Sequence, residues 1–401
     1  MSLLTRNKGA LPLLMFNIFL VFVGVGLIVP VMPAYMDELG LSGSAMGILV
    51  AVFSLTQLLC SPLVGKWSDQ YGRKIMVVIG MVIFSISELI FGLANSLGVL
   101  FIARLLGGMG AACITPTIMA YVADVTTLKE RGTGMGLINA AISMGFIIGP
   151  GIGGFLADYG TRVPFYAAAV AGALGFILSL LILPEPLSKE KRQEARLKPS
   201  SNENLLKQFV RSYHAPYFIG LVIIFVISFG IANVETVFSL YLDHKYGFTA
   251  KEIASLVTIS GILGAVAQLS IFGWLVNRFG ETKVIHVCLG LASLFTVLTL
   301  FAHKYWIIMV TIFVIFLATD ILRPAVSTFM SRLAGDEQGF VAGMNSSYTS
   351  LGNIVGPALA GFLFDVNVNF PYLFAAIVLF ACLILSMSWG KISKRKAAHM
   401  N

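Results

Sequence analysis

Long apolar runs separated by short charged clusters form the main pattern of this chain. We count twelve such runs, each close to the length of about 20 residues that an α-helix needs to cross a bilayer. No run alternates between polar and apolar positions in the way a half-buried strand does. The pattern therefore predicts an all-α integral membrane protein with twelve transmembrane helices. The runs cover roughly residues 12–36, 44–65, 75–94, 98–123, 133–157, 162–183, 216–241, 251–274, 283–302, 305–330, 340–364 and 370–389.

The composition agrees with this prediction and excludes several classes of protein. Hydrophobic residues make up 57% of the 401 residues and charged residues only 11%, with a mean hydropathy of +0.89. Soluble domains contain about 45–50% apolar and about 25% charged residues. A soluble enzyme, a disordered chain and a coiled coil are thereby excluded. The first run is too long for the apolar region of a signal peptide, so we expect a retained first helix.

The positive charges predict the orientation of the chain. Of the 27 lysines and arginines, 21 lie at the N-terminus, at the C-terminus or in every second connection, whereas only four lie in the remaining connections. Arg104 and Arg323 lie inside apolar runs. Because cytoplasmic loops carry an excess of Lys and Arg, we expect both termini in the cytoplasm. The chain is then a multi-pass protein of the plasma membrane.

One long polar stretch, residues 184–215, divides the chain into two similar parts. We interpret it as a cytoplasmic linker, either a plain solvated connector or a partly helical segment on the membrane surface. The predicted domains are an N-terminal six-helix half (1–183), this linker, and a C-terminal six-helix half (216–401) with a short cytoplasmic tail.

The two halves resemble each other at a nearly constant offset, which indicates a duplicated unit. GKWSDQYG (65–72) matches GWLVNRFG (273–280) at +208, and GFIIGPGIGG (145–154) matches GNIVGPALAG (352–361) at +207. Pro116 matches Pro324, also at +208. Two pseudo-symmetric six-helix repeats around a central cavity are typical of transporters.

The strongest local motif follows the second run and consists of Gly65, Asp69, Gly72, Arg73 and Lys74. We expect Gly65 to let two helices approach closely, and Asp69 to lie near the start of the next helix, where it accepts backbone N–H bonds and pairs with a base. Such a latch can join two helix ends in one state and release them in another. The alternative is a turn whose basic residues only set the topology.

Two further features extend the latch. Asp124, at the end of the fourth run, is placed to pair with its basic residues. The second copy is degenerate, because Asn277 replaces the acidic residue, so we expect no strong charge latch there.

A glycine-proline motif in the fifth run predicts a smooth helix face. Gly145, Gly149 and Gly153 are spaced by four residues and therefore share one face, while Gly154 follows and Pro150 can kink the helix. Such a face permits close packing and sliding against a partner helix. The motif serves either gating or tight packing alone.

Ionisable residues inside the apolar runs are candidates for proton coupling. A charge at the bilayer centre costs about 2.5–3.5 kcal/mol on insertion scales, so Glu88, Arg104, Glu235, Asp320 and Arg323 are expected to face a cavity or a partner. Asp320 and Arg323 are three residues apart and can pair on one helix. Glu235 has no basic neighbour in the sequence. A carboxylate that binds a cationic solute when ionised, and releases it when protonated from outside, would couple the two flows.

These motifs resemble the major facilitator superfamily, and in particular the NorA/Bmr/Blt group of bacterial multidrug efflux pumps. The resemblance rests on GKWSDQYGRK, FIARLLGGMGAA, GFIIGPGIGG and FVGVGLIVPVMP, and on further matches at 244–254, 320–331 and 342–361. It implies proton-driven export of diverse, mostly cationic amphipathic compounds. It also implies proton-coupling roles for Glu235, Asp320, Arg323 and Arg104. The expected substrate-binding residues are Phe22, Gln57, Phe146, Glu235, Phe316 and Asp320.

We expect no cofactor, no metal and no enzymatic activity, because the sequence has no nucleotide-binding loop, metal cluster or nucleophile arrangement. The four cysteines have the scattered spacing of core residues. The expected partners are small amphipathic cations, protons and the lipid bilayer, with no nucleic acid, and the protein is expected to act as a monomer. The alternatives are an exporter of one physiological substrate such as a polyamine, an importer, and a non-transporting membrane receptor.

Overall fold

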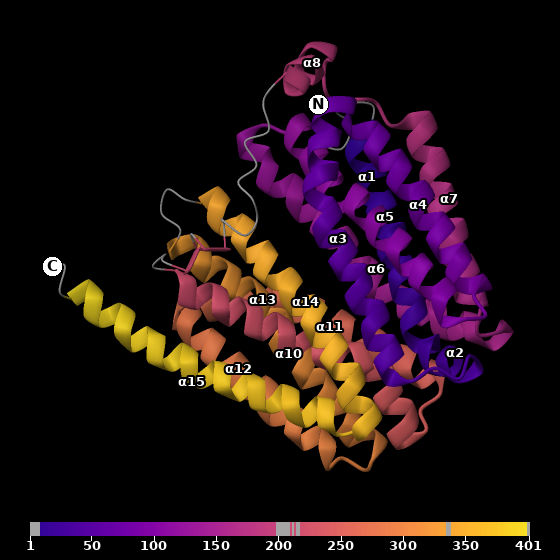
Figure 1. Ribbon diagram of the computed structural model, residues 1–401. Helices are drawn as coiled ribbons and strands as arrows, with labels where there is room; N and C mark the ends of the chain where they lie inside the picture. The colour runs from indigo at the N-terminus through magenta and orange to yellow at the C-terminus, as the bar shows by residue number, and fades with distance from the viewer. Residues whose placement is uncertain (1–8, 198–208, 211, 214–216, 334–337, 399–401) are drawn as a thin grey trace. The chain divides into compact units, whose positions relative to one another are not determined.

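The computed structural model describes residues 9–197, 209–210, 212–213, 217–333 and 338–398. Over these residues the chain forms helices and connections, and no β-strand. The helices are long and predominantly apolar, and twelve of those described can cross a membrane by length and composition. The predicted all-α, twelve-span architecture is confirmed, and the chain is a multi-pass membrane protein. The main helices are α1 (Ala10–Ile28), α2 (Met32–Glu38), α3 (Gly43–Tyr71), α4 (Arg73–Leu93), α5 (Leu97–Val125), α6 (Leu128–Leu156), α7 (Val163–Ile182), α8 (Lys189–Leu197), α10 (Phe218–Tyr246), α11 (Ala250–Phe279), α12 (Glu281–Leu300), α13 (Tyr305–Leu333), α14 (Gln338–Val366) and α15 (Phe370–Ala398) (Figure 1).

The helices extend beyond several of the predicted runs, and the connections are correspondingly short. α3 continues to Tyr71 and α4 begins at Arg73, so a single residue, Gly72, separates them. Gly280 separates α11 from α12 in the same way. Both glycines have positive φ, +117° and +78°, a backbone region that other residues rarely adopt. The sharp reversals explain why these glycines recur at an offset of 208 residues.

The first compact unit comprises residues 1–41, 52–201 and 248–258, in so far as they are described. Inside it, α1 packs against α6 and α7, and α4 packs against α5 and α7. Aliphatic and aromatic side chains fill the space between these helices. The fully buried members include Leu14, Ile18, Val77, Met81, Phe84, Ile114 and Tyr121.

The second unit comprises residues 42–51, 202–247 and 259–401, again where described, and it repeats the same packing scheme. α10 packs against α14 and α15, and α12 packs against α13 and α15. These four pairings correspond one by one to the four pairings of the first unit. The repetition of helix contacts supports the duplicated six-helix unit that the sequence motifs indicate. The core of this unit includes Leu221, Leu289, Leu322, Ala325 and Met330.

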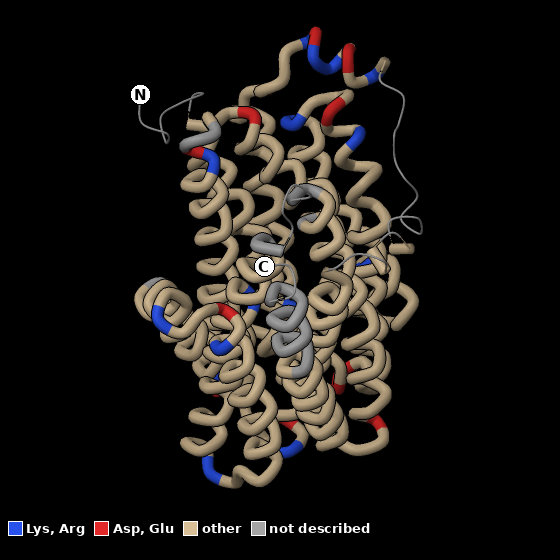
Figure 2. The backbone as a smooth tube through the Cα atoms, turned by 90° about the vertical axis from the view of Figure 1, so that its left-hand side faces the viewer, with Lys and Arg blue, Asp and Glu red and all other residues tan. Residues whose placement is uncertain are grey.

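Many large apolar side chains lie on the outside of the helices. Leu181, Phe155, Trp306 and Val366 are each more than 70% exposed. Figure 2 shows the long uncharged stretches of chain on which such residues lie. On a soluble protein such surfaces would cause aggregation, whereas in a bilayer they contact lipid.

In the first unit, one cation ties several helix ends together. The Arg162 guanidinium, just before α7, donates to the Gly92 carbonyl at 3.2 Å, to Asn95 Oδ1 at 3.0 Å and to Glu38 Oε1 at 3.1 Å. Glu38 also accepts a bond from the Thr161 hydroxyl at 2.5 Å. The ends of α2, α4 and α7 are therefore held by one arginine and one carboxylate.

The second unit has a comparable tie made by a lysine. The Lys245 ammonium, near the end of α10, donates to the Leu300 carbonyl at 2.8 Å, to Asn369 Oδ1 at 2.7 Å and to the Tyr241 hydroxyl at 2.8 Å. Leu300 follows Gly92 by 208 residues, so both cations cap the carbonyl end of equivalent helices. The lysine tie, unlike the arginine tie, uses only neutral acceptors.

Candidate functional site

The predicted latch is assembled around Arg73 at the start of α4. Its guanidinium lies 2.6 Å from Asp69 Oδ1 and donates to Asp124 Oδ2 at 2.9 Å and to the Ser68 hydroxyl. Arg73 is only 8% exposed, which makes these charge-assisted bonds stronger than surface ion pairs. The expected pairing of Asp124 with a basic residue of the motif is confirmed. One side chain thereby joins the end of α3, the start of α4 and the end of α5.

Two expectations about this motif are wrong. Asp69 lies in the last turn of α3 rather than near the start of the next helix, because the helix continues through the motif to Tyr71. It therefore pairs with Arg73 across the chain reversal at Gly72 and does not cap α4. Gly65 does not mediate a close approach, since a Cβ placed there would meet nothing within 4 Å in the described part of the chain.

The cap of α4 comes from Glu185, which our sequence analysis missed. Its carboxylate accepts the backbone N–H groups of Arg73 and Lys74, both at 3.0 Å, and that of Leu187 at 3.2 Å. The Lys74 ammonium donates to the Leu180 carbonyl at 2.8 Å. Two features of the sequence could have indicated this cap. Glu185 stands between two prolines just after the sixth span, and the first turn of α4 contains two cations and no acid of its own.

The predicted smooth face of α6 lies against α1. A Cβ on Gly145 would lie 2.7 Å from the Phe22 Cβ, and one on Gly149 would lie 2.7 Å from the Val23 carbonyl. Gly153 faces the Leu27 backbone in the same way. The three glycines thus share one contact face.

The remaining residues of this motif make separate contacts within the same unit. Pro150 lies inside α6, with its Cδ 2.8 Å from the position of a Cβ on Gly26. Gly154 faces Ala254 and the Ala250 carbonyl, at the start of α11. Small residues therefore line α6 on two sides.

The acidic candidates of the second unit lie close to Arg323. Arg323 donates to Glu235 Oε1 at 2.9 Å, although the two residues are 88 positions apart in the chain. Both side chains are about half exposed, at 56% and 45%. Asp320 forms no salt bridge within the described residues, and its Oδ2 lies 2.6 Å from the position of a Cβ on Gly264 in α11. The arrangement brings two carboxyl groups and one guanidinium to one region.

The observed pair is not the one that spacing along the helix permits. By spacing, Asp320 and Arg323 can pair and Glu235 has no base nearby in the sequence, but Arg323 extends from α13 to Glu235 on α10. The arginine thus pairs with an acid on a neighbouring helix, although another acid lies one turn away on its own helix.

A pocket of the second unit places Glu235 beside an aromatic side chain. It is lined by residues of α10, α12, α13 and α15. Phe316, a predicted substrate-binding residue, belongs to the lining and packs against Phe238 at a centroid distance of 5.4 Å. The other lining residues are Gly230, Ile231, Val234, Thr296, Ile315, Thr319 and Leu379.

The first unit contributes further predicted residues. Phe22 and Phe146 meet with ring centroids 4.9 Å apart, one from α1 and the other from α6. Gln57, on α3, lies against Gly108 of α5. The Arg104 guanidinium lies 4.1 Å from the centroid of the Phe91 ring. The cation is thus held on an aromatic face, an arrangement that stabilises charge in apolar surroundings.

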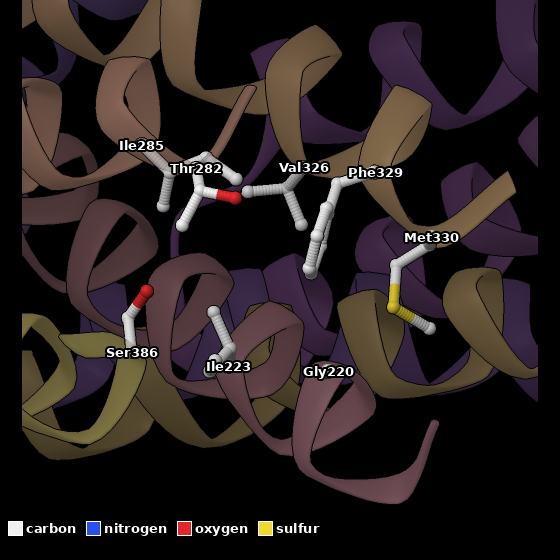
Figure 3. A pocket seen from close by; sticks show the side chains of 8 residues that line it. All are labelled: Gly220, Ile223, Thr282, Ile285, Val326, Phe329, Met330 and Ser386. Atoms are coloured by element: carbon white, nitrogen blue, oxygen red, sulfur yellow. The ribbon is translucent and has the colours of Figure 1, made fainter. Parts of the chain in front are cut away.

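A second pocket of the second unit has no charged side chain in its lining. Figure 3 shows its lining, in which the hydroxyl groups of Thr282 and Ser386 are the only polar side-chain groups. None of the predicted site residues belongs to it. The remaining lining residues are Gly220, Ile223, Ile285, Val326, Phe329 and Met330.

Comparisons with known proteins agree with this fold and these motifs. Residues 14–233 and 220–399 match the Major Facilitator Superfamily. Multidrug resistance protein 2 of Bacillus subtilis is 49% identical over 399 residues, 99% of each chain. Quinolone resistance protein NorA of Staphylococcus aureus is 38% identical, covering 93% of this chain and 94% of NorA. Among solved structures, a variant of the nucleoside transporter NupG superposes with a TM-score of 0.78 at 15% identity, over 95% of this chain and 99% of that one. This last likeness shows the fold alone.

Proposed function

Because the chain belongs to the major facilitator superfamily, a family of membrane transporters rather than enzymes, we propose that it exports diverse amphipathic cations in exchange for protons. Relatives that match almost the full chain are named for resistance to multiple drugs or to quinolones. The chain is then a multidrug efflux pump of a bacterial membrane, with the basic ends of its helices in the cytoplasm.

The observation that carries the proton-coupled part is the balance of charges around Arg323. Glu235 is paired with the Arg323 guanidinium, Asp320 lies one helical turn from Arg323 on the same helix, and Glu235 and Phe316 line the same pocket. A cationic solute finds there a carboxylate for its charge and an aromatic face for its apolar part. The Glu235–Arg323 pair is half exposed and therefore not enclosed by the second unit, so a ligand can approach it.

In this mechanism Arg323 acts as an internal competitor of the transported cation. A solute that binds Glu235 displaces Arg323, which lies one helical turn from Asp320 and can then pair with it. Pairing favours the ionised form of Asp320 and expels its proton. Protonation of Asp320 from outside returns Arg323 to Glu235 and releases the solute. Proton and solute thus oppose each other through one guanidinium, as reciprocal linkage requires.

The remaining predicted residues lie in the first unit. There Phe22, Phe146 and Gln57 offer aromatic and polar groups to a solute, and Arg104 shapes the local electrostatics. The latch around Arg73 and the glycine face of α6 serve the conformational change between the two access states. None of these residues forms or breaks a covalent bond, because transport requires no such reaction.

The test is drug-coupled proton flux in reconstituted vesicles. We expect ethidium to dissipate an imposed pH gradient in vesicles that contain the wild-type chain. The Glu235→Gln and Asp320→Asn variants should abolish this coupling, whereas Glu190→Gln, which removes an exposed acid on α8, should not change it. The Arg323→Met variant should bind ethidium but lose the coupling to protons.

Two results would overturn the proposal. If Glu235→Gln and Asp320→Asn both move dye uphill at the wild-type rate, the acids do not couple the flows. If wild-type vesicles exchange protons only for a single small substrate such as a polyamine, the chain is a narrow exporter. A chain that binds dye but moves no solute would instead be a receptor.

A further inference from the structure

The start of α4 combines features that oppose each other. Its first two residues are the cations Arg73 and Lys74, and its first turn contains no acid. The N-terminus of a helix carries a partial positive charge and unpaired N–H groups, so cations there are unfavourable. The latch nevertheless needs Arg73 at this position, because its guanidinium joins Asp69 to Asp124.

Glu185 resolves this conflict from a distant part of the chain. Its two oxygens accept the backbone N–H groups of Arg73 and Lys74, more than 110 residues away in sequence. Gly72 makes room for it, since a Cβ on Gly72 would lie 2.8 Å from the Glu185 carboxyl carbon. The positive φ of Gly72 turns the chain so that both N–H groups point at this carboxylate.

The second unit lacks this requirement. The position equivalent to Arg73, 208 residues later, is Glu281, so α12 carries an acid in its own first turn. The sequence motif there is degenerate as well, with Asn277 in place of Asp69. The start of α4, whose first turn holds two cations, is thus capped by a carboxylate from another part of the chain. The start of the equivalent helix α12 has an acid of its own in the first turn.

The segment that carries Glu185 is itself fixed to the first unit. The Tyr121 hydroxyl donates to the Pro184 carbonyl at 2.5 Å. Farther along, α8 lies beyond the ends of the long helices (Figure 1), where Arg192 donates to the Tyr71 carbonyl at 3.3 Å and Arg196 to the Gln70 carbonyl at 3.1 Å. Cations thereby cap the last carbonyls of α3, and an anion caps the first N–H groups of α4.

We propose that Glu185 is a positioning residue of the latch, and that Glu185, Arg192 and Arg196 belong to the latch rather than to a free linker. The carboxylate fixes the backbone of Arg73, and this sets the direction in which the guanidinium reaches Asp69 and Asp124. Without it the start of α4 frays and the latch loses its geometry. The role of the latch in transport rests on the proposed function, whereas the backbone contact does not.

The first experiment measures amide hydrogen exchange in the purified full-length chain. In Glu185→Gln, peptides that contain Arg73 and Lys74 should exchange about ten-fold faster or more, as expected for losing hydrogen bonds to a charged group. Peptides at the start of α12 should exchange as in the wild type. Unchanged exchange at the start of α4 would overturn the proposal, whatever the chain transports.

Glu190→Gln is the matched control. Glu190 lies on α8, where hydrogen bonds from its own backbone N–H and the Ser188 hydroxyl, together with the charge of Arg192, hold its pKa below the ordinary value. The control therefore removes the same charge from the same segment without touching α4. Glu185→Asp, which keeps the charge with a shorter reach, should fall between the wild type and Glu185→Gln.

A second experiment separates positioning from general stability. We would compare ethidium transport rates per folded pump in Arg73→Ala, in Glu185→Gln and in the double variant. If Glu185 acts through Arg73, the double variant should be no slower than Arg73→Ala alone. If the two losses multiply, Glu185 acts independently of the latch and the positioning role is refuted.

Discussion

Replacing Gly149 by alanine tests the packing of α6 on α1 most directly. The added Cβ would lie 2.7 Å from the Val23 carbonyl oxygen and 2.9 Å from the Gly26 Cα. Ordinary contact begins near 3.4 Å, so these backbone atoms would have to retreat by about 0.5–0.7 Å. Backbone yields less easily than the end of a flexible side chain, and we expect α1 and α6 to separate.

The magnitude follows from two opposing effects. Gly→Ala inside a helix gains about 1 kcal/mol from helix propensity, whereas overpacking a close contact costs about 1–3 kcal/mol. Gly136 offers a matched control on the same helix, because a Cβ there would meet none of the described residues within 4 Å. Gly136→Ala should be neutral or stabilising. The difference between the two variants then isolates the clash, about 1–3 kcal/mol.

The assay is thermal unfolding of the purified protein in detergent, followed by dye transport in vesicles. We expect a midpoint several degrees lower for Gly149→Ala than for Gly136→Ala, and a slower transport rate per folded pump. Equal midpoints for the two variants would show that the close approach of α6 to α1 does not exist. Equal transport at a lowered midpoint would restrict the glycine face to packing alone.

Three further predictions follow from contacts described above. Gly264→Ala should slow proton-coupled transport without changing any charge, because the added Cβ would displace the Asp320 carboxylate. Gly273→Ala on the same helix would meet none of the described residues within 4 Å and should transport normally. Lys245→Met should destabilise the second unit by about 1–3 kcal/mol through three lost hydrogen bonds, measured as a lowered thermal midpoint; an unchanged midpoint would contradict the tie. Arg73→Lys should weaken the latch, because an ammonium lacks the planar fork that reaches Asp69, Ser68 and Asp124 together. Backbone amides at the end of α3 should then exchange hydrogen faster than in the wild type, and wild-type protection would argue against this geometry.

The sequence predicted best those features that depend on local periodicity. Apolar runs specify spans because a helix in lipid must satisfy its own backbone hydrogen bonds. The four-residue spacing of Gly145, Gly149 and Gly153 likewise places them on one face in any regular helix, and they share one contact face in the structure. The pairing of Asp124 could be predicted because this residue ends a span on the same side of the membrane as the basic motif.

Features that depend on packing between distant helices were harder to predict. The Glu235–Arg323 pair needs α10 and α13 to approach each other, which no local spacing reveals, whereas spacing shows that Arg323 can pair with the neighbouring Asp320. Glu185 was missed because its partners are backbone N–H groups, which have no residue-type signature. For Gly65, the residue type alone did not distinguish a packing glycine from an open position.

The two ties at the ends of the helices would respond differently to acid. Arg162 depends on the carboxylate of Glu38, so protonation of that group removes one partner and leaves the Gly92 carbonyl and Asn95 as acceptors. Lys245 binds a hydroxyl, an amide oxygen and a carbonyl, none of which takes up a proton in the physiological range. These ends lie away from the basic clusters, so the positive-inside rule predicts that they face the outside of the cell. One unit therefore has a tie that protonation of a carboxylate can weaken, whereas the corresponding tie of the other unit has no acidic partner among the contacts described above.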